Sequence, residues 1–82
     1  MELSPNERLI LETIRDDVFS TLRAVAIATE LPYPAVRYNY WRLMVGGLVE
    51  GFELTYAGHK ALAGEPLIDS DLRDHVDLRH TK

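Results

Sequence analysis

The chain has 82 residues, 46% of them hydrophobic and 27% charged, which is the composition of an ordinary globular domain and excludes a disordered chain. It contains no cysteine, so a disulfide framework and a thiolate zinc site are excluded. Nine basic and 13 acidic residues give a net charge of -4, which excludes a nucleic-acid coat protein that relies on bulk positive charge.

The beginning of the chain predicts a cytoplasmic protein with no membrane partner. Residues 1–5 lack the basic start and the apolar run of a secretion signal. No apolar stretch approaches the roughly 20 residues that are needed to cross a bilayer. The lack of cysteine agrees with a reducing compartment.

The first expected helix begins with a capping box. Ser4 is a favourable cap, Pro5 suits the first helical position, and Glu7 stands three residues after the cap. The following apolar residues have the spacing of one buried helical stripe that ends near Phe19. The residues of this stripe are Ile10, Leu11, Ile14 and Val18.

A second, alanine-rich helix is expected over residues 22–30, with Ser20 and Thr21 as natural caps. Its inward side consists of Leu22, Val25, Ala26 and Thr29. The two prolines of residues 31–34 end this helix, because proline removes a backbone donor and disfavours helical geometry in the residue before it. The chain is therefore expected to turn here.

A third helix is expected over residues 34–45, ended by two glycines. At about 100° per residue, Val36, Tyr40 and Leu43 fall on its core side, with Asn39 and Met44 at the flanks. The opposite side carries Pro34, Ala35, Tyr38, Trp41, Arg42 and Val45, with Arg37 near the border. Arg37 and Arg42 are the only charges within residues 31–47, so this segment is positive in an acidic chain.

The remaining sequence predicts a hairpin, a fourth helix and a tail. Residues 48–50 and 52–54 alternate apolar and polar on either side of Gly51, as two short antiparallel strands would. Thr55 can cap a helix over residues 56–63. We therefore expect one domain over residues 1–66 and an acidic C-terminal tail over residues 67–82, either a loosely docked short helix or a frayed end.

These elements predict a mainly α fold with a small β-hairpin: a three-helix core, two short antiparallel strands and a C-terminal helix. PAVRYNYWRLMVGGLV at residues 34–49 resembles the recognition helix and first strand of repressors of the arsenical-resistance and multiple-antibiotic-resistance type. LTYAGHKAL at residues 54–62 resembles the segment with which these domains leave the second strand. The resemblance covers residues 5–63 and implies a winged helix-turn-helix domain. Glu30 stands where the family often has glycine, and Gly51 alone separates the strands where relatives carry a basic loop.

The resemblance implies sequence-specific binding of double-stranded DNA by a small transcriptional regulator, with the helix of residues 34–45 in the major groove. Base edges are then expected to meet Ala35, Arg37 and Tyr38, and phosphates or sugars to meet Arg23, Tyr33 and Arg42. Because these basic contacts are few, useful affinity calls for a homodimer that reads two half-sites.

Trp41 leaves three roles open: packing over the hairpin or the first helix, contact with DNA, or contact with a protein. Tyr38 and Trp41 beside Arg42 form the combination enriched at protein-binding hot spots. The alternative function is therefore a protein–protein interaction module that uses the same helix face without nucleic acid. The third alternative is that the domain is a structural part of a larger assembly and has no ligand of its own.

No phosphate loop, nucleophile motif or nucleotide fingerprint is present, so we expect no enzyme, no catalytic residue and no cofactor. The histidines are expected at the surface rather than on a metal, since His75 and His80 are five residues apart and would lie about 140° apart on a helix. The residues considered for a metal site are His59, Asp71, Asp74, His75, Asp77 and His80.

Overall fold

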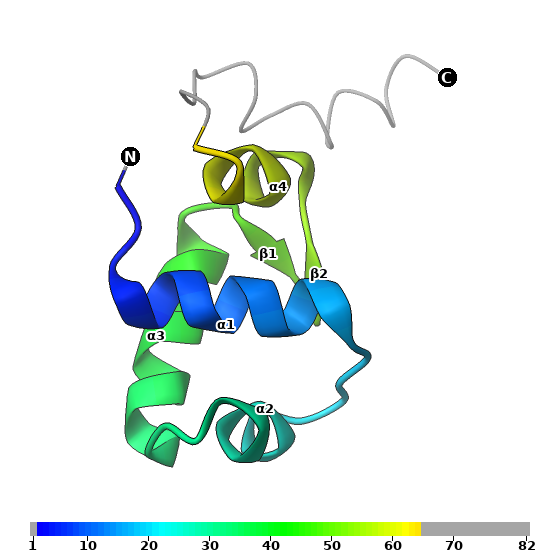
Figure 1. Cartoon of the computed structure of the whole chain (residues 1–82). Coiled ribbons are helices and arrows are strands. Elements are labelled where there is room, and N and C mark those ends of the chain that lie inside the picture. Colours follow the sequence, from blue (N-terminus) through cyan, green and yellow to red (C-terminus); the bar gives the residue numbers. More distant parts are fainter. Residues whose placement is uncertain (1, 65–82) are drawn as a thin grey trace.

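The computed structural model describes residues 2–64; the expected tail over residues 67–82, with His75 and His80, lies outside the described residues. The described part is mainly helical with a small two-stranded antiparallel sheet (Figure 1), as the sequence predicts. Its elements in chain order are α1 (Pro5–Asp16), α2 (Leu22–Thr29), α3 (Tyr33–Val45), β1 (Val49–Glu50), β2 (Glu53–Leu54) and α4 (Tyr56–Leu62).

Helix α1 has the predicted capping box but ends earlier than its apolar stripe predicts. The Ser4 hydroxyl accepts from the Glu7 backbone N–H at 3.2 Å, and the Glu7 carboxylate accepts from the Ser4 N–H at 2.9 Å. The helix ends at Asp16, and Asp17 is extended, with φ -150°. Val18 therefore leaves the helical register and is 92% exposed, so its assignment to the buried stripe was wrong.

Helix α2 is capped as expected, by Thr21, whose hydroxyl accepts from the Ala24 N–H at 3.1 Å. It ends one residue before the predicted end, because Glu30 takes the left-handed conformation at φ 61°. The Glu30 N–H donates to the Ile27 carbonyl at 3.3 Å. A short turn then leads to α3, which begins at Tyr33 after Pro32 and has no side-chain cap.

The core lies where α1 crosses the other elements. Figure 1 shows α1 with α2 on one side and the hairpin with α4 on the other, while α3 runs across behind it. Large apolar side chains of α1, α2, α3 and β1 fill this crossing. The core residues are Ile10, Leu11, Ile14, Val25, Ala26, Val36, Tyr40, Leu43, Leu48, Val49, Ala57 and Ala61.

The hairpin is fixed to α3 by polar groups and by an aromatic pair. Val49 pairs with Leu54 and Glu50 with Glu53, so the loop consists of Gly51 and Phe52. The expectation that Gly51 alone separates the strands was therefore wrong, and its φ of 62° fits the first loop position of a tight hairpin turn. The Tyr40 hydroxyl donates to the Gly51 carbonyl, and its ring stacks on Phe52 with centroids 5.5 Å apart.

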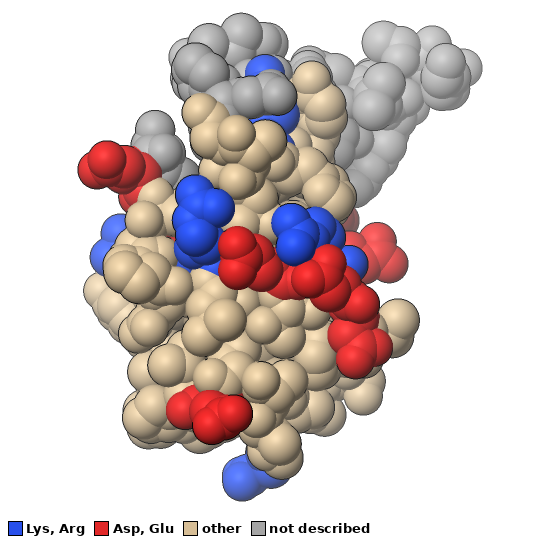
Figure 2. All heavy atoms as spheres, in the orientation of Figure 1, with Lys and Arg blue, Asp and Glu red and all other residues tan. Residues whose placement is uncertain are grey.

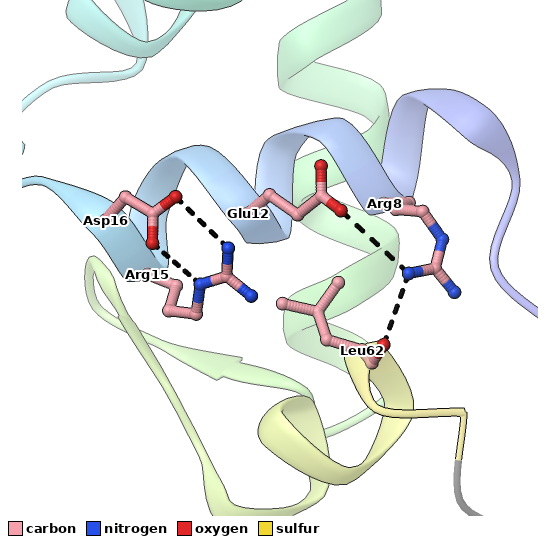
Figure 3. Close-up of polar contacts among 5 residues, drawn as sticks. All are labelled: Arg8, Glu12, Arg15, Asp16 and Leu62. Atoms are coloured by element: carbon pink, nitrogen blue, oxygen red, sulfur yellow. Dashed lines mark hydrogen bonds and ion pairs between the residues drawn. The ribbon is translucent and has the colours of Figure 1, made fainter.

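Helix α4 begins at the predicted cap, with the Thr55 hydroxyl accepting from the Gly58 N–H at 3.1 Å and donating to the Gly47 carbonyl at 2.6 Å. It is tied to α1 by Arg8, whose Nη1 donates to the Leu62 carbonyl at 3.2 Å (Figure 3). The helix therefore closes the side of the core opposite α2.

The exposed side of α1 carries ion pairs between neighbouring residues (Figure 3). Arg8 lies 3.9 Å from Glu12, and Arg15 donates to both carboxylate oxygens of Asp16, at 2.7 and 3.1 Å. The hydrogen bond from Arg15 holds the pKa of the Asp16 carboxyl below its ordinary value. Both arginines of α1 thus have partners within the protein.

Within residues 2–64, no helix is long and apolar enough to cross a membrane.

Candidate nucleic-acid interface

One side of α3 is buried against the core and the other is left uncovered. The predicted core side is confirmed, since Val36, Tyr40 and Leu43 are buried. On the outer side Tyr38 is 57% exposed and Trp41 is 55% exposed. Trp41 is not among the core residues or the side chains packed against them, so a role as a core residue is not supported.

The outer side of α3 forms one wall of an apolar groove of about 540 Å³. The start of α2 forms the other wall, through the half-buried Leu22. No carboxylate lines this groove within the part of the chain that the structure describes. The lining residues are Leu22, Pro34, Arg37, Tyr38, Tyr40, Trp41 and Met44.

Among the described residues, Arg37 is the one charged residue of the groove wall. It is exposed, and within residues 2–64 it has no carboxylate within ion-pair distance. Its guanidinium is thus available to an external acceptor, such as a base edge or a phosphate oxygen.

Arg42 is placed differently from Arg37, because it has a partner inside the protein. Its Nε lies 3.7 Å from the Glu7 carboxylate, which joins α3 to the first turn of α1. Its guanidinium also lies 5.9 Å from the centre of the Tyr38 ring. The side chain remains 54% exposed, so one side of the guanidinium is open to solvent.

Arg23 and Tyr33, two of the predicted contacts with the DNA backbone, lie together. The Arg23 guanidinium is 5.4 Å from the centre of the Tyr33 ring. This contact joins the first turn of α2 to the first residue of α3. A cation and a hydroxyl group are thereby presented at the same end of the two helices.

Ala35 and Asn39 contribute less to the outer face. Ala35, predicted to approach base edges, is only half-exposed. Its carbonyl accepts a hydrogen bond of 2.7 Å from the Asn39 side-chain amide. Asn39 is the only carboxamide in α3, and it bonds to the backbone of its own helix.

Charge separates this region from the rest of the described surface. Residues 22–45 carry the arginines at positions 23, 37 and 42 and one acidic residue, Glu30. Figure 2, in the orientation of Figure 1, shows acidic and basic side chains intermixed in a belt across the middle of the molecule, where α1 lies. The α2–α3 region is therefore positive on a protein that is acidic elsewhere.

A second hollow, of about 620 Å³, lies between the end of α1, the hairpin and α4. Its charged lining is largely engaged, since Arg15 bonds to Asp16 and the Asp17 carboxylate accepts from the Val18 N–H at 2.7 Å. His59, also in the lining, is exposed as expected. Within residues 2–64, no group of three potential metal ligands is close enough to hold an ion.

Two features of the site had no clear sequence signal. The pairing of Glu7 with Arg42 joins residues 35 positions apart, and Glu7 was assigned only to the capping box. Leu22 was assigned to the core of α2, yet it also lines the groove beside α3. Both depend on how α1 and α2 pack against α3, which periodicity within one helix does not give.

None of the protein-family models, characterised proteins or solved structures compared with this chain matches it.

Proposed function

We propose that the protein binds double-stranded DNA through α3, as a small winged helix-turn-helix regulator of transcription. The observation that carries the proposal is the uncovered outer side of α3, beside three arginines and a single carboxylate over residues 22–45. In a protein of net charge -4, a segment with three arginines and one carboxylate beside an uncovered helix face is suited to a local contact with a polyanion.

The turn between α2 and α3 supports the assignment to this fold class. The resemblance places glycine at the position of Glu30, and Glu30 has the left-handed φ of 61° that glycine adopts most readily. The chain then leaves α3 into a hairpin and α4, the order found in winged helices. The hairpin loop of two residues is short for a wing, so α3 makes the main contact with DNA in the proposed complex.

In the proposed complex the outer side of α3 enters the major groove. Arg37 hydrogen-bonds to a base edge, since its guanidinium is exposed and has no ion-pair partner within residues 2–64. Arg23 and Tyr33 contact a phosphate and its sugar, and the open side of Arg42 contacts a second phosphate.

Two copies are needed for useful affinity in this proposal. Three arginines supply at most about three phosphate or base contacts for each chain, which leaves a monomer with weak binding. A homodimer places two α3 helices in successive major grooves and doubles these contacts. Sedimentation of the protein alone and with a 24-base-pair duplex tests this stoichiometry, and one chain for each duplex under saturating conditions contradicts it.

Salt dependence of binding to a random-sequence duplex tests the proposed function directly. About two neutralised phosphates for each chain, at Arg23 and Arg42, predict that affinity falls on the order of 10-fold for each bound chain between 50 and 200 mM salt, because condensed counterions are released on binding. Flat or absent binding at low salt contradicts the proposal.

Matched arginine variants separate specific from general contacts. Arg37→Ala is expected to relax sequence preference, and Arg42→Ala to weaken all sequences alike. Arg15→Ala is the control, because Arg15 is paired with Asp16 on the exposed side of α1 and should leave DNA binding unchanged.

One observation favours a second function, namely a protein partner seated in the apolar groove. Tyr38 and Trp41 expose aromatic surface there beside Arg42, a residue combination found at hot spots. If duplex DNA does not bind at low salt, this second function takes the place of the first.

A further inference from the structure

The hydrogen-bonding groups of the groove limit which base edges α3 can read. Adenine is read in the major groove by the carboxamide of Asn or Gln, and cytosine by a carboxylate. Asn39, the only carboxamide of α3, donates to the Ala35 carbonyl at 2.7 Å and is half-buried. No carboxylate lines the groove within residues 2–64. The groove therefore lacks the usual readers of adenine and cytosine.

Besides the hydroxyl of the exposed Tyr38, two kinds of group remain on the outer side of α3. Arg37 can donate two parallel hydrogen bonds to guanine. Apolar and aromatic surface forms most of the remaining wall, with Trp41 55% exposed and Met44 46% exposed. In the major groove of DNA, the apolar group that projects from a base edge is the C5-methyl group of thymine.

We propose that the apolar groove of α3 reads thymine through its C5-methyl groups, beside a guanine held by Arg37. This inference rests on the proposed function, since it names the class of DNA sequence that the same face selects. Charge supports DNA as the occupant, because the one charged residue of the groove wall among residues 2–64 is a cation, and two further arginines lie on α2 and α3. The half-site is thus expected to hold thymine next to guanine.

Replacing thymine with uracil tests this reading, because it removes the methyl group and leaves every hydrogen-bonding position unchanged. Two random pools of 24-base-pair duplex are used as probes, identical except that one contains uracil. Duplexes selected from the thymine pool are expected to be rich in thymine and guanine. Their uracil counterparts are expected to bind about fourfold more weakly for each methyl group lost, from the loss of buried apolar surface.

The outcomes separate the two proposals. Equal affinity of the matched thymine and uracil duplexes overturns the methyl reading alone and leaves DNA binding in place. Failure of both pools to bind at low salt overturns the proposed function and the methyl reading together.

Protein variants give a second, independent measurement. Trp41→Ala is expected to reduce the ratio of thymine to uracil affinity toward one, and Arg37→Ala to keep that ratio while losing the preference for guanine. Ile27→Ala is the matched control, because Ile27 is a 73% exposed apolar residue of α2 that does not line the groove. An unchanged ratio in folded Trp41→Ala protein, checked by circular dichroism, overturns the role of the groove.

Discussion

Helix α3 contacts the β-hairpin through its core side, yet the outer side of α3 and the hairpin differ in how their polar groups are used. On α3, Arg37 is exposed without an ion-pair partner among residues 2–64, and the aromatic rings beside it face solvent. At the hairpin, Gly51 accepts a hydrogen bond from Tyr40. Glu50 and Glu53 stand opposite each other as a cross-strand pair with exposed side chains.

This difference separates stability from binding. The hairpin is held by its hydrogen bond and ring contact with Tyr40 on the core side of α3, so changes there are expected to alter folding. The outer side of α3 contributes little to the core, so changes there are expected to alter binding with little effect on folding. Substitutions in each region test this division.

The largest expected effect is that of Gly58→Ala, in the packing of α4 against the hairpin. A Cβ at this position would overlap the Leu48 carbonyl oxygen and lie 3.3 Å from the Leu54 Cβ. Because the overlapping atoms belong to the Leu48 backbone, which cannot shift easily, we expect a loss of about 3 kcal/mol in the free energy of unfolding. Urea unfolding followed by circular dichroism measures it.

Gly64→Ala is the control for this prediction, because a Cβ there meets open space and only the φ of 80° is unfavourable. It is expected to cost about 1 kcal/mol. Equal losses for the two variants would mean that α4 does not pack on the hairpin as described.

Tyr40→Phe is expected to lower the free energy of unfolding by about 1 kcal/mol, through loss of the hydrogen bond to Gly51. Burial raises the pKa of the Tyr40 hydroxyl above its ordinary value of 10.0. The neutral hydroxyl of Tyr40 is therefore favoured in the folded protein. Its contribution to the free energy of unfolding is complete below pH 10.0 and is lost as the pH rises through the pKa of the folded state. Unfolding measured between pH 8 and 11 should show a smaller alkaline decline in Tyr40→Phe than in the parent protein.

Glu53→Lys tests whether the hairpin lies near the DNA phosphates in the proposed complex. Glu53 is exposed on the strand that follows the loop packed against Tyr40. Reversing a charge about 10 Å from a phosphate is expected to raise affinity for duplex DNA about fourfold at low salt. Glu53→Gln, which makes half the change in charge, should raise it about twofold. An effect that does not scale with charge would place the hairpin away from the DNA.

The sequence predicted most of the fold, because its signals are local. The capping box of Ser4 and Glu7, the cap at Thr55 and the inward side of α3 each depend on residues within one or two turns. Val18 was assigned wrongly because a period of four continues through it, whereas Asp17 breaks the helix.

The candidate site was less predictable, because it depends on contacts between elements. The helical period placed Trp41 on the outer side of α3 and still left a packing role open. Nothing in the sequence predicts that Arg42 has an ion-pair partner, because only the folded chain brings Glu7 to Arg42. The turn at Glu30 was predictable in part. The resemblance places glycine at this position, and the backbone there has the conformation that glycine favours.

Glu30→Gly has the smallest expected effect, and it tests whether this turn is under strain. Glu30 is exposed, and its φ of 61° places its Cβ in an unfavourable position that glycine avoids. Part of the gain is offset by the greater freedom of glycine in the unfolded chain, so we expect stabilisation of about 0.5 to 1 kcal/mol. Glu30→Ala is the matched control, because it removes the same charge and retains the Cβ. Thermal unfolding should rank glycine above both glutamate and alanine; if alanine stabilises as much as glycine, charge rather than backbone conformation limits the stability of the turn.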